Sequence, residues 1–273
     1  MSTDARLPID TAPRLAFDDS GAPGGHGAPD APVVVLLHGL TFDRTTWGPI
    51  VERLAPRYRV IAFDLPAHGD TGGTPVSNFL IACQVHTQLD ELHVVDPVIV
   101  GHSMSGTIAA LYAAHFPVAG AVSVDQVPDI RPLVPLATSI DRDLSADDFA
   151  RAFAPMQAFM RLENLPSSSR QLVERAQARN ARPATVFGYW DQLLGGDVDE
   201  LQAAIDHDLR RVTAPVLAVF GHLLTLEEHS FLDTRFTAPI ELVELEDAGH
   251  FVHLARADDF SAVLTAFIDR VTS

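Results

Sequence analysis

The sequence predicts an α/β fold with a mostly parallel, doubly wound sheet, in which helices cover both faces. Short, continuously apolar runs alternate along the chain with longer segments of helical periodicity. Strands buried on both faces read as continuous apolar runs, whereas half-exposed strands alternate apolar and polar residues. The chain has 273 residues, of which 47% are hydrophobic, so it can bury the core of one large domain.

Six apolar runs are predicted to be the buried strands, and each ends in a turn-forming or polar residue. They span residues 33–37, 58–63, 94–100, 120–124, 216–220 and 240–245. Residues 14–17 are expected to add a short strand before a Pro- and Gly-rich loop. The segments between the strands have helical periodicity, and the predicted helices span residues 47–55, 76–91, 103–115 and 258–271.

The alternation of strands and helices is interrupted at residues 128–211. This stretch has helical periodicity, with Phe149, Phe153 and Met160 near one face, and Pro155 is expected to kink its first helix. We therefore expect a core domain formed by residues 1–127 and 212–273, with residues 128–211 inserted as a helical cap.

Charge and composition exclude several classes of partner and mechanism. The 36 acidic residues outnumber 19 basic ones, giving a net charge of −17, which argues against nucleic-acid and anionic-membrane partners. All basic residues are arginines, so lysine Schiff-base and Walker-type chemistry are excluded. A single cysteine, Cys83, and the absence of a signal-peptide or membrane-spanning pattern favour a cytoplasmic protein. The oligomeric state is not predicted.

The segment Gly101-His102-Ser103-Met104-Ser105-Gly106 follows an apolar run and opens an Ala-rich helix. A sharp turn between a strand and a helix is the setting of a nucleophilic serine, and the residues two before and two after must be small. Gly101 and Ser105 meet this demand. The helix N-terminus also favours a developing anion beside Ser103. The alternative is that Ser103 merely caps the helix.

In this motif, and over residues 33–271, the chain resembles the α/β-hydrolase family. Residues 38–41 (His-Gly-Leu-Thr) resemble its oxyanion loop, residues 64–69 its turn after the next strand, and residues 247–251 (Asp-Ala-Gly-His-Phe) its histidine loop. Residues 128–211 lie where the family carries a cap. The resemblance implies that the backbone N–H groups of Leu40 and Met104 form the oxyanion hole, and His250 is the candidate base.

The acid that would orient His250 is less obvious. The position expected from the resemblance is occupied by Leu224, which cannot orient a histidine. Asp125, directly after the strand at 120–124, is one candidate, and Glu227 or Glu228 is another; a chain with no functional acid is the third possibility. We predict that an Asp125 carboxylate oxygen lies within about 2.6–3.2 Å of a ring nitrogen of His250.

The remaining motifs indicate chemistry without a cofactor or a metal, since the chain has no GxGxxG before a helix, no P-loop and no HExxH pattern. Most apolar cap residues are expected to form the cap's own core or to dock it on the sheet. The remainder, with Met156, Phe159 and Trp190 as candidates, are expected to line an apolar substrate pocket. The sequence therefore predicts a serine hydrolase, an esterase or lactonase acting on a small neutral or apolar substrate. The alternatives are a receptor-like ligand-binding protein and a lyase or perhydrolase with the same residues.

Overall fold

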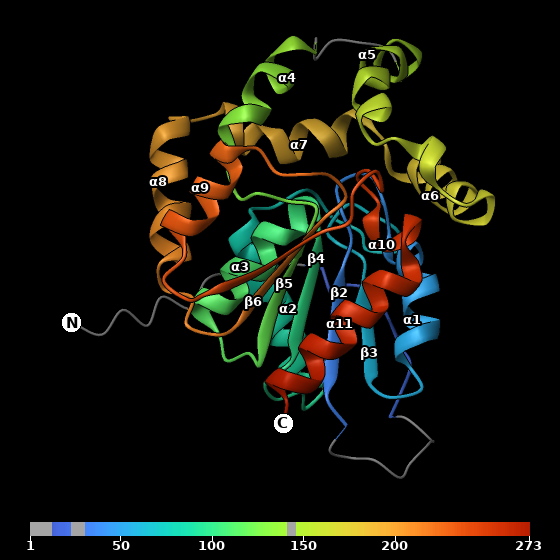
Figure 1. Ribbon diagram of the computed structural model, residues 1–273. Coiled ribbons are helices and arrows are strands. Elements are labelled where there is room, and N and C mark those ends of the chain that lie inside the picture. Colours follow the sequence, from blue (N-terminus) through green and yellow to red (C-terminus); the bar gives the residue numbers. More distant parts are fainter. Residues whose placement is uncertain (1–12, 23–30, 141–145) are drawn as a thin grey trace.

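A computed structural model describes residues 13–22, 31–140 and 146–273. Its seven strands form one sheet in the order β1-β3-β2-β4-β5-β6-β7 (Figure 1). All neighbours pair in parallel except β1 and β3. The strands are β1 (Phe17–Asp19), β2 (Val33–Leu37), β3 (Arg59–Phe63), β4 (Val98–His102), β5 (Gly120–Val124), β6 (Val216–Phe220) and β7 (Ile240–Glu244). The predicted α/β fold with a mostly parallel sheet is confirmed.

Two strands begin several residues later than the sequence predicts. The first strand lies at Phe17–Asp19 rather than at residues 14–17, and it pairs antiparallel with β3 at the sheet edge. The strand predicted from residue 94 begins only at Val98. Asp96 has a φ of 45°, and Pro97, which follows it, has no N–H to donate to a ladder. The apolar run therefore includes a turn before the strand.

Helices cover both faces of the sheet. Alternate residues of β2 point to opposite sides: Val34 packs in a cluster with Trp47 and Phe260, and Val35 in a cluster with Ile81. The first cluster includes α1 (Gly48–Leu54) and α11 (Ala257–Val271), with α10 (Val252–Ala255) beside them. The second includes α2 (Asn78–Glu91) and α3 (Met104–His115). The core thus lies in two layers around a sheet that is buried on both faces.

The stretch between β5 and β6 is helical in its described residues. It contains the 3-10 turns η3 (Arg131–Leu133) and η4 (Leu162–Asn164), and the helices α4 (Val134–Ser139), α5 (Ala146–Phe159), α6 (Ser167–Asn180), α7 (Pro183–Leu194) and α8 (Val198–Leu209). Figure 1 shows α4 to α7 together at one end of the sheet. The last helix, α8, packs instead on the core, where Ile205 and Leu209 join a cluster with Ala110 of α3. The division of the chain into core and cap at residues 128 and 211 stays a prediction.

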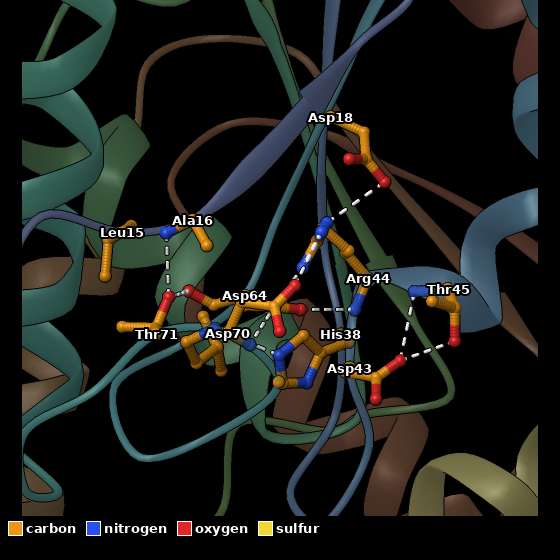
Figure 2. A network of polar contacts seen from close by, with 12 residues as sticks. Leu15, Ala16, Asp18, His38, Asp43, Arg44, Thr45, Asp64, Asp70 and Thr71 are labelled. Carbon is orange, nitrogen blue, oxygen red and sulfur yellow. Dashed lines mark hydrogen bonds and ion pairs between the residues drawn. The ribbon is translucent and has the colours of Figure 1, made fainter.

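A charged network around Arg44 joins the loops after β2 and β3 (Figure 2), and Asn180 connects it to α6. The Arg44 guanidinium lies 3.0 Å from Asp18 and 2.9 Å from Asp70, and it also pairs with the fully buried Asp64. Asn180 of α6 accepts a hydrogen bond from the Gly69 N–H at 2.9 Å and donates to another carboxylate, Asp43, at 3.0 Å. The network therefore holds both loops and the end of α6 in one arrangement.

No helix in the described ranges is long and apolar enough to cross a membrane.

Candidate active site

Ser103 occupies the sharp turn between β4 and α3. Its backbone has φ 54° and ψ −130°, a conformation that non-glycine residues rarely adopt. The Ser103 N–H donates to Val124 O at 2.8 Å, which fixes the turn to the neighbouring strand. A Cβ on Gly101 would lie only 1.8 Å from Ser105 O, so the tight turn requires glycine there. The Ser103 side chain forms no capping hydrogen bond to the helix, contrary to the simple N-cap interpretation.

Ser105, where the resembled motif has glycine, has a structural role. Its hydroxyl donates to His38 O at 2.5 Å, which ties the start of α3 to the loop after β2. The side chain is fully buried. The next residue, Gly106, cannot carry a side chain without a steric clash, because a Cβ there would lie 2.3 Å from Ser123 Oγ. The serine at 105 is thus compatible with the turn and contributes a fixed contact to the neighbouring loop.

The loop after β2 passes directly beside Ser103: a Cβ on Gly39 would lie 3.0 Å from Ser103 Cβ. Two buried histidines hold this loop. His38 accepts from the Leu65 N–H at 3.0 Å, and His68 accepts from the Thr41 N–H at 3.0 Å. Burial lowers the pKa of His38 to about 4 and that of His68 to about 3. Both rings are therefore neutral near pH 7 and can keep accepting these bonds.

The two predicted oxyanion donors are backbone N–H groups on the two segments that flank Ser103. Leu40 belongs to the loop after β2, and Met104 is the first residue of α3. Within the described part of the chain, neither backbone N–H donates a hydrogen bond to another residue. Their availability is what an oxyanion hole requires.

Asp125 and His250 form a close pair. His250 Nδ1 lies 2.7 Å from Asp125 Oδ2, within the predicted range, and the Gly221 N–H donates to Asp125 Oδ1 at 2.9 Å. Burial opposes ionisation of the Asp125 carboxyl, but hydrogen bonds from His222 and His250 and the Gly221 N–H together hold its pKa well below its usual range. Asp125 is therefore a carboxylate at neutral pH, and it fixes the His250 tautomer with Nδ1 protonated.

The loop that carries His250 is held from several sides. The Gly249 N–H donates to Gly221 O at 2.9 Å, and a Cβ on Gly221 would lie 1.9 Å from Gly249 O. The loops after β6 and β7 therefore approach each other so closely that Gly221 has no room for a side chain. From beneath, His102 Nε2 donates to His250 O at 2.8 Å. From the cap, Asn164 donates to Asp247 O at 2.7 Å. Sequence reasoning did not identify Gly221 or Asn164, because neither carries a reactive group.

The structure also shows what Leu224 and the alternative acid Glu228 contact. Leu224 packs in an apolar cluster with Phe220 and Leu232. Glu228 does not contact His250: its carboxylate caps α9 (Leu226–Arg235) by accepting from the Thr225 N–H at 2.8 Å, and it lies 3.8 Å from His222. Of the candidate acids, the structure thus brings Asp125 to His250.

The three predicted pocket residues lie in different surroundings. Met156 is half-buried and contacts two apolar clusters, one around Phe42 and one around Phe153. Phe159 is 72% exposed, and its ring centroid lies 6.2 Å from that of His250. Trp190 is buried inside the cap cluster, 6.3 Å from the Phe153 ring. A small apolar cavity lies elsewhere, between α3, β5, β6 and α9, and its lining includes neither Ser103 nor His250.

The residues of the site do not form a metal centre. In residues 13–22, 31–140 and 146–273, no group of three or more His, Cys, Asp or Glu side chains has a geometry that could hold a metal ion. What the arrangement offers instead is a serine on a strained turn, an imidazole oriented by a buried carboxylate, and unpaired N–H donors.

Residues 34–263 match the Alpha/beta hydrolase family. The chain belongs to this family. It is 27% identical over 256 residues to the "Magnesium-chelatase 30 kDa subunit" of Rhodobacter capsulatus, covering 89% of each chain. It is 28% identical over 261 residues to a pimeloyl-[acyl-carrier protein] methyl ester esterase of Yersinia pseudotuberculosis, covering 86% of this chain and 93% of the relative.

The fold also matches solved structures of α/β hydrolases. The enol-lactonase of Burkholderia xenovorans LB400 superposes with a TM-score of 0.69 and 21% identity, covering 94% of this chain and 97% of that one. Proteins named as an esterase and a lactonase are thus among those that this chain resembles.

Proposed function

We propose that this α/β hydrolase cleaves a carboxylic ester or lactone through an acyl-enzyme on Ser103. The observation that supports the proposal most is the 2.7 Å contact between Asp125 and His250, because it orients an imidazole that packs against His102, the residue before Ser103. Ser103 follows β4, Asp125 follows β5, and His250 follows β7. The carboxyl ends of parallel strands lie at one edge of the sheet, which is where ligands of open α/β sheets bind.

The proposed mechanism assigns one role to each group. His250 Nε2 takes the proton from Ser103 Oγ as the hydroxyl attacks the carbonyl carbon, and Asp125 stabilises the imidazolium through Nδ1–H. The N–H groups of Leu40 and Met104 donate to the tetrahedral oxyanion. When the intermediate collapses, His250 returns the proton to the leaving alcohol. A water molecule, deprotonated by the same imidazole, then releases the acid and regenerates the serine.

The substrate class follows from the charge and the cap. A net charge of −17 disfavours anionic substrates, and the cap places one apolar ring, that of Phe159, beside His250. The names of two similar proteins, a methyl ester esterase and an enol-lactonase, fit a small neutral ester or lactone. The proposal requires no cofactor, because the side chains of the site supply every proton transfer.

Turnover of simple substrates tests the proposal. The purified protein is expected to hydrolyse short p-nitrophenyl esters or a neutral γ- or δ-lactone, with pre-steady-state release of one alcohol per chain when deacylation is slower than acylation. Absence of turnover across esters of increasing acyl length and both lactones, by a protein with a native thermal transition, would contradict it.

One observation favours a second candidate function, a ligand-binding protein that turns over slowly or not at all. The relative from Rhodobacter capsulatus is named as a subunit of a chelatase rather than as a hydrolase. For this candidate, small esters and lactones would bind, with a measurable shift in the thermal transition, but would be recovered intact.

The cap is expected to determine substrate preference. Phe159 lies exposed beside His250, so Phe159→Ala should change the ratio of kcat/KM between short and long acyl esters. The expected change corresponds to about 1–3 kcal/mol in the free energy that separates the two transition states, for each lining group removed. Met156→Ala is expected to act in the same direction. Both are measured on a series of p-nitrophenyl esters.

Val95→Ala is the control for this series. Val95 is an exposed apolar residue that precedes β4, at the end of the strand opposite to Ser103. Trp190→Ala serves a different purpose: Trp190 is buried in the cap, and its removal is expected to lower the thermal transition. Selectivity profiles of the Phe159 and Met156 variants that match the parent would show that neither side chain lines the pocket.

A further inference from the structure

His222 lies against the other oxygen of the carboxylate that orients His250. It follows Gly221 at the carboxyl end of β6, and its Nδ1 is 3.3 Å from Asp125 Oδ1, whereas His250 Nδ1 is 2.7 Å from Oδ2. Its other nitrogen, Nε2, lies 3.8 Å from Glu228 Oε1. Two imidazoles and two carboxylates therefore alternate in a chain that runs from His250 through Asp125 and His222 to Glu228.

The outer end of this chain is held in place by secondary structure. Glu228 belongs to a capping box at the start of α9: its Oε2 accepts from the Thr225 N–H at 2.8 Å, and its own N–H donates to Thr225 Oγ at 3.2 Å. With Oε2 engaged in this way, Oε1 is the oxygen that faces His222. The His222 ring also packs edge-on against Phe220, with centroids 5.7 Å apart.

We propose that His222 is a positioning residue for the Asp125–His250 pair, and that its protonation between Asp125 and Glu228 weakens this pair at low pH. The inference rests on the proposed function of Ser103 and His250. In its neutral form with a proton on Nδ1, His222 places an N–H group against Asp125 Oδ1, at an Nδ1–Oδ1 distance of 3.3 Å. Together with the Gly221 N–H, this contact keeps the carboxylate oriented so that Oδ2 meets His250.

Protonation changes the charge at this position. The His222 side chain is 43% exposed, so Nε2 can take a proton from solvent, and both N–H groups then face carboxylates. The hydrogen bond to Asp125 is the main cause that raises the His222 pKa above its usual value; burial opposes it, and the charges of Asp125 and Glu228 add to it. Cationic His222 then shares the Asp125 charge and repels the imidazolium that forms on His250 during attack, which slows the reaction.

The charged groups around His222 come from three elements. Asp125 follows β5, His250 lies across the same carboxylate on the loop after β7, and Glu228 belongs to α9. Glu244 of β7 lies 3.5 Å from a different histidine, His229. Because His222 and His250 contact the two oxygens of one carboxylate, a charge on His222 acts directly on the Asp125–His250 pair.

The test compares pH profiles of kcat/KM for the parent and three variants on one p-nitrophenyl ester. His222→Asn keeps an N–H donor toward Asp125 but cannot be protonated. We expect the parent to lose rate in two steps on the acid limb. The upper step, which follows protonation of His222, should lower the rate by on the order of tenfold or less. His222→Asn should show one step, with a near-neutral rate within about threefold of the parent.

Glu228→Gln should move the upper step to lower pH, because the capping box is kept while the charge facing Nε2 is removed. Glu227→Gln is the matched control: this neighbouring carboxylate is exposed, and its removal should leave both steps in place.

A second measurement does not depend on turnover. The Hε1 proton resonances of His222 and His250 are followed by NMR as the pH is varied. In the parent, protonation of His222 should shift the His250 resonance together with the His222 resonance. This shift of the His250 resonance should be absent in His222→Asn.

The possible results separate this inference from the proposed function. A one-step rate profile in the parent with a His250 resonance that does not follow the protonation of His222, or identical curves in the parent and His222→Asn, would overturn the role of His222 while leaving the hydrolase proposal standing. A His250 resonance that follows the protonation of His222, in a protein that hydrolyses no ester or lactone, would support the coupling and refute the hydrolase.

Discussion

Ser103→Ala is expected to abolish almost all ester turnover, lowering kcat by about 10⁴-fold or more, while the protein folds normally. The substitution removes only Oγ, which makes no capping bond to α3, and it keeps the Cβ that already tolerates the φ of 54°. The nucleophile is lost, whereas the oxyanion donors and the pocket remain. Steady-state kinetics on the best p-nitrophenyl ester, with the thermal transition measured in parallel, checks this expectation.

Ser230→Ala provides the matched control, since Ser230 is exposed on α9 and should leave both rate and transition unchanged. A Ser103→Ala variant that retains near-parental turnover would show that another group attacks the substrate.

Asp125→Asn is expected to have the second largest effect, a loss of about 10⁴ in kcat. An amide at this position can still accept from the Gly221 N–H through its oxygen, so the β5–β6 contact is kept. Its NH2 group, however, would face His250 and favour the tautomer with a proton on Nε2, which cannot accept the proton of Ser103. The imidazolium would also lose the carboxylate that stabilises it.

Glu227→Gln tests the competing assignment of the acid, because Glu227 was one of the sequence candidates. It is expected to keep kcat within about threefold of the parent. A larger loss for Glu227→Gln than for Asp125→Asn would transfer the role of the acid away from Asp125.

The sheet could be predicted from the sequence because burial on both faces leaves a direct mark, the short continuous apolar run. The same pattern misled where an apolar run included a turn, as at residues 94–97, and where a short edge strand such as Phe17–Asp19 has no apolar run. The sharp turn at Ser103 could be predicted because it demands small neighbours at 101 and 105, a requirement that is local in the sequence.

The surroundings of Asp125 could be predicted only in part. Its place directly after a buried strand put it at the carboxyl-end edge of the sheet. It became a candidate because Leu224, which has no carboxylate, occupies the position where the family resemblance places the acid. The role of His222 could not be seen, because it depends on which oxygen of Asp125 faces β6 and on the start of α9. The signal that was available is the Gly221-His222 pair directly after a buried strand, followed by Thr225 and Glu228 at capping-box spacing. The contact of Asn164 with Asp247 joins two distant loops and has no local signature.

Covalent labelling by a fluorophosphonate, read by intact-mass and peptide mass spectrometry, tests the central claim most directly. The account predicts one adduct per chain on Ser103 in the parent, no adduct in Ser103→Ala, and slower labelling in Asp125→Asn, because the reagent reacts with a serine activated by its oriented histidine. An adduct on another residue, or no adduct on a natively folded parent chain at reagent excess, would contradict it.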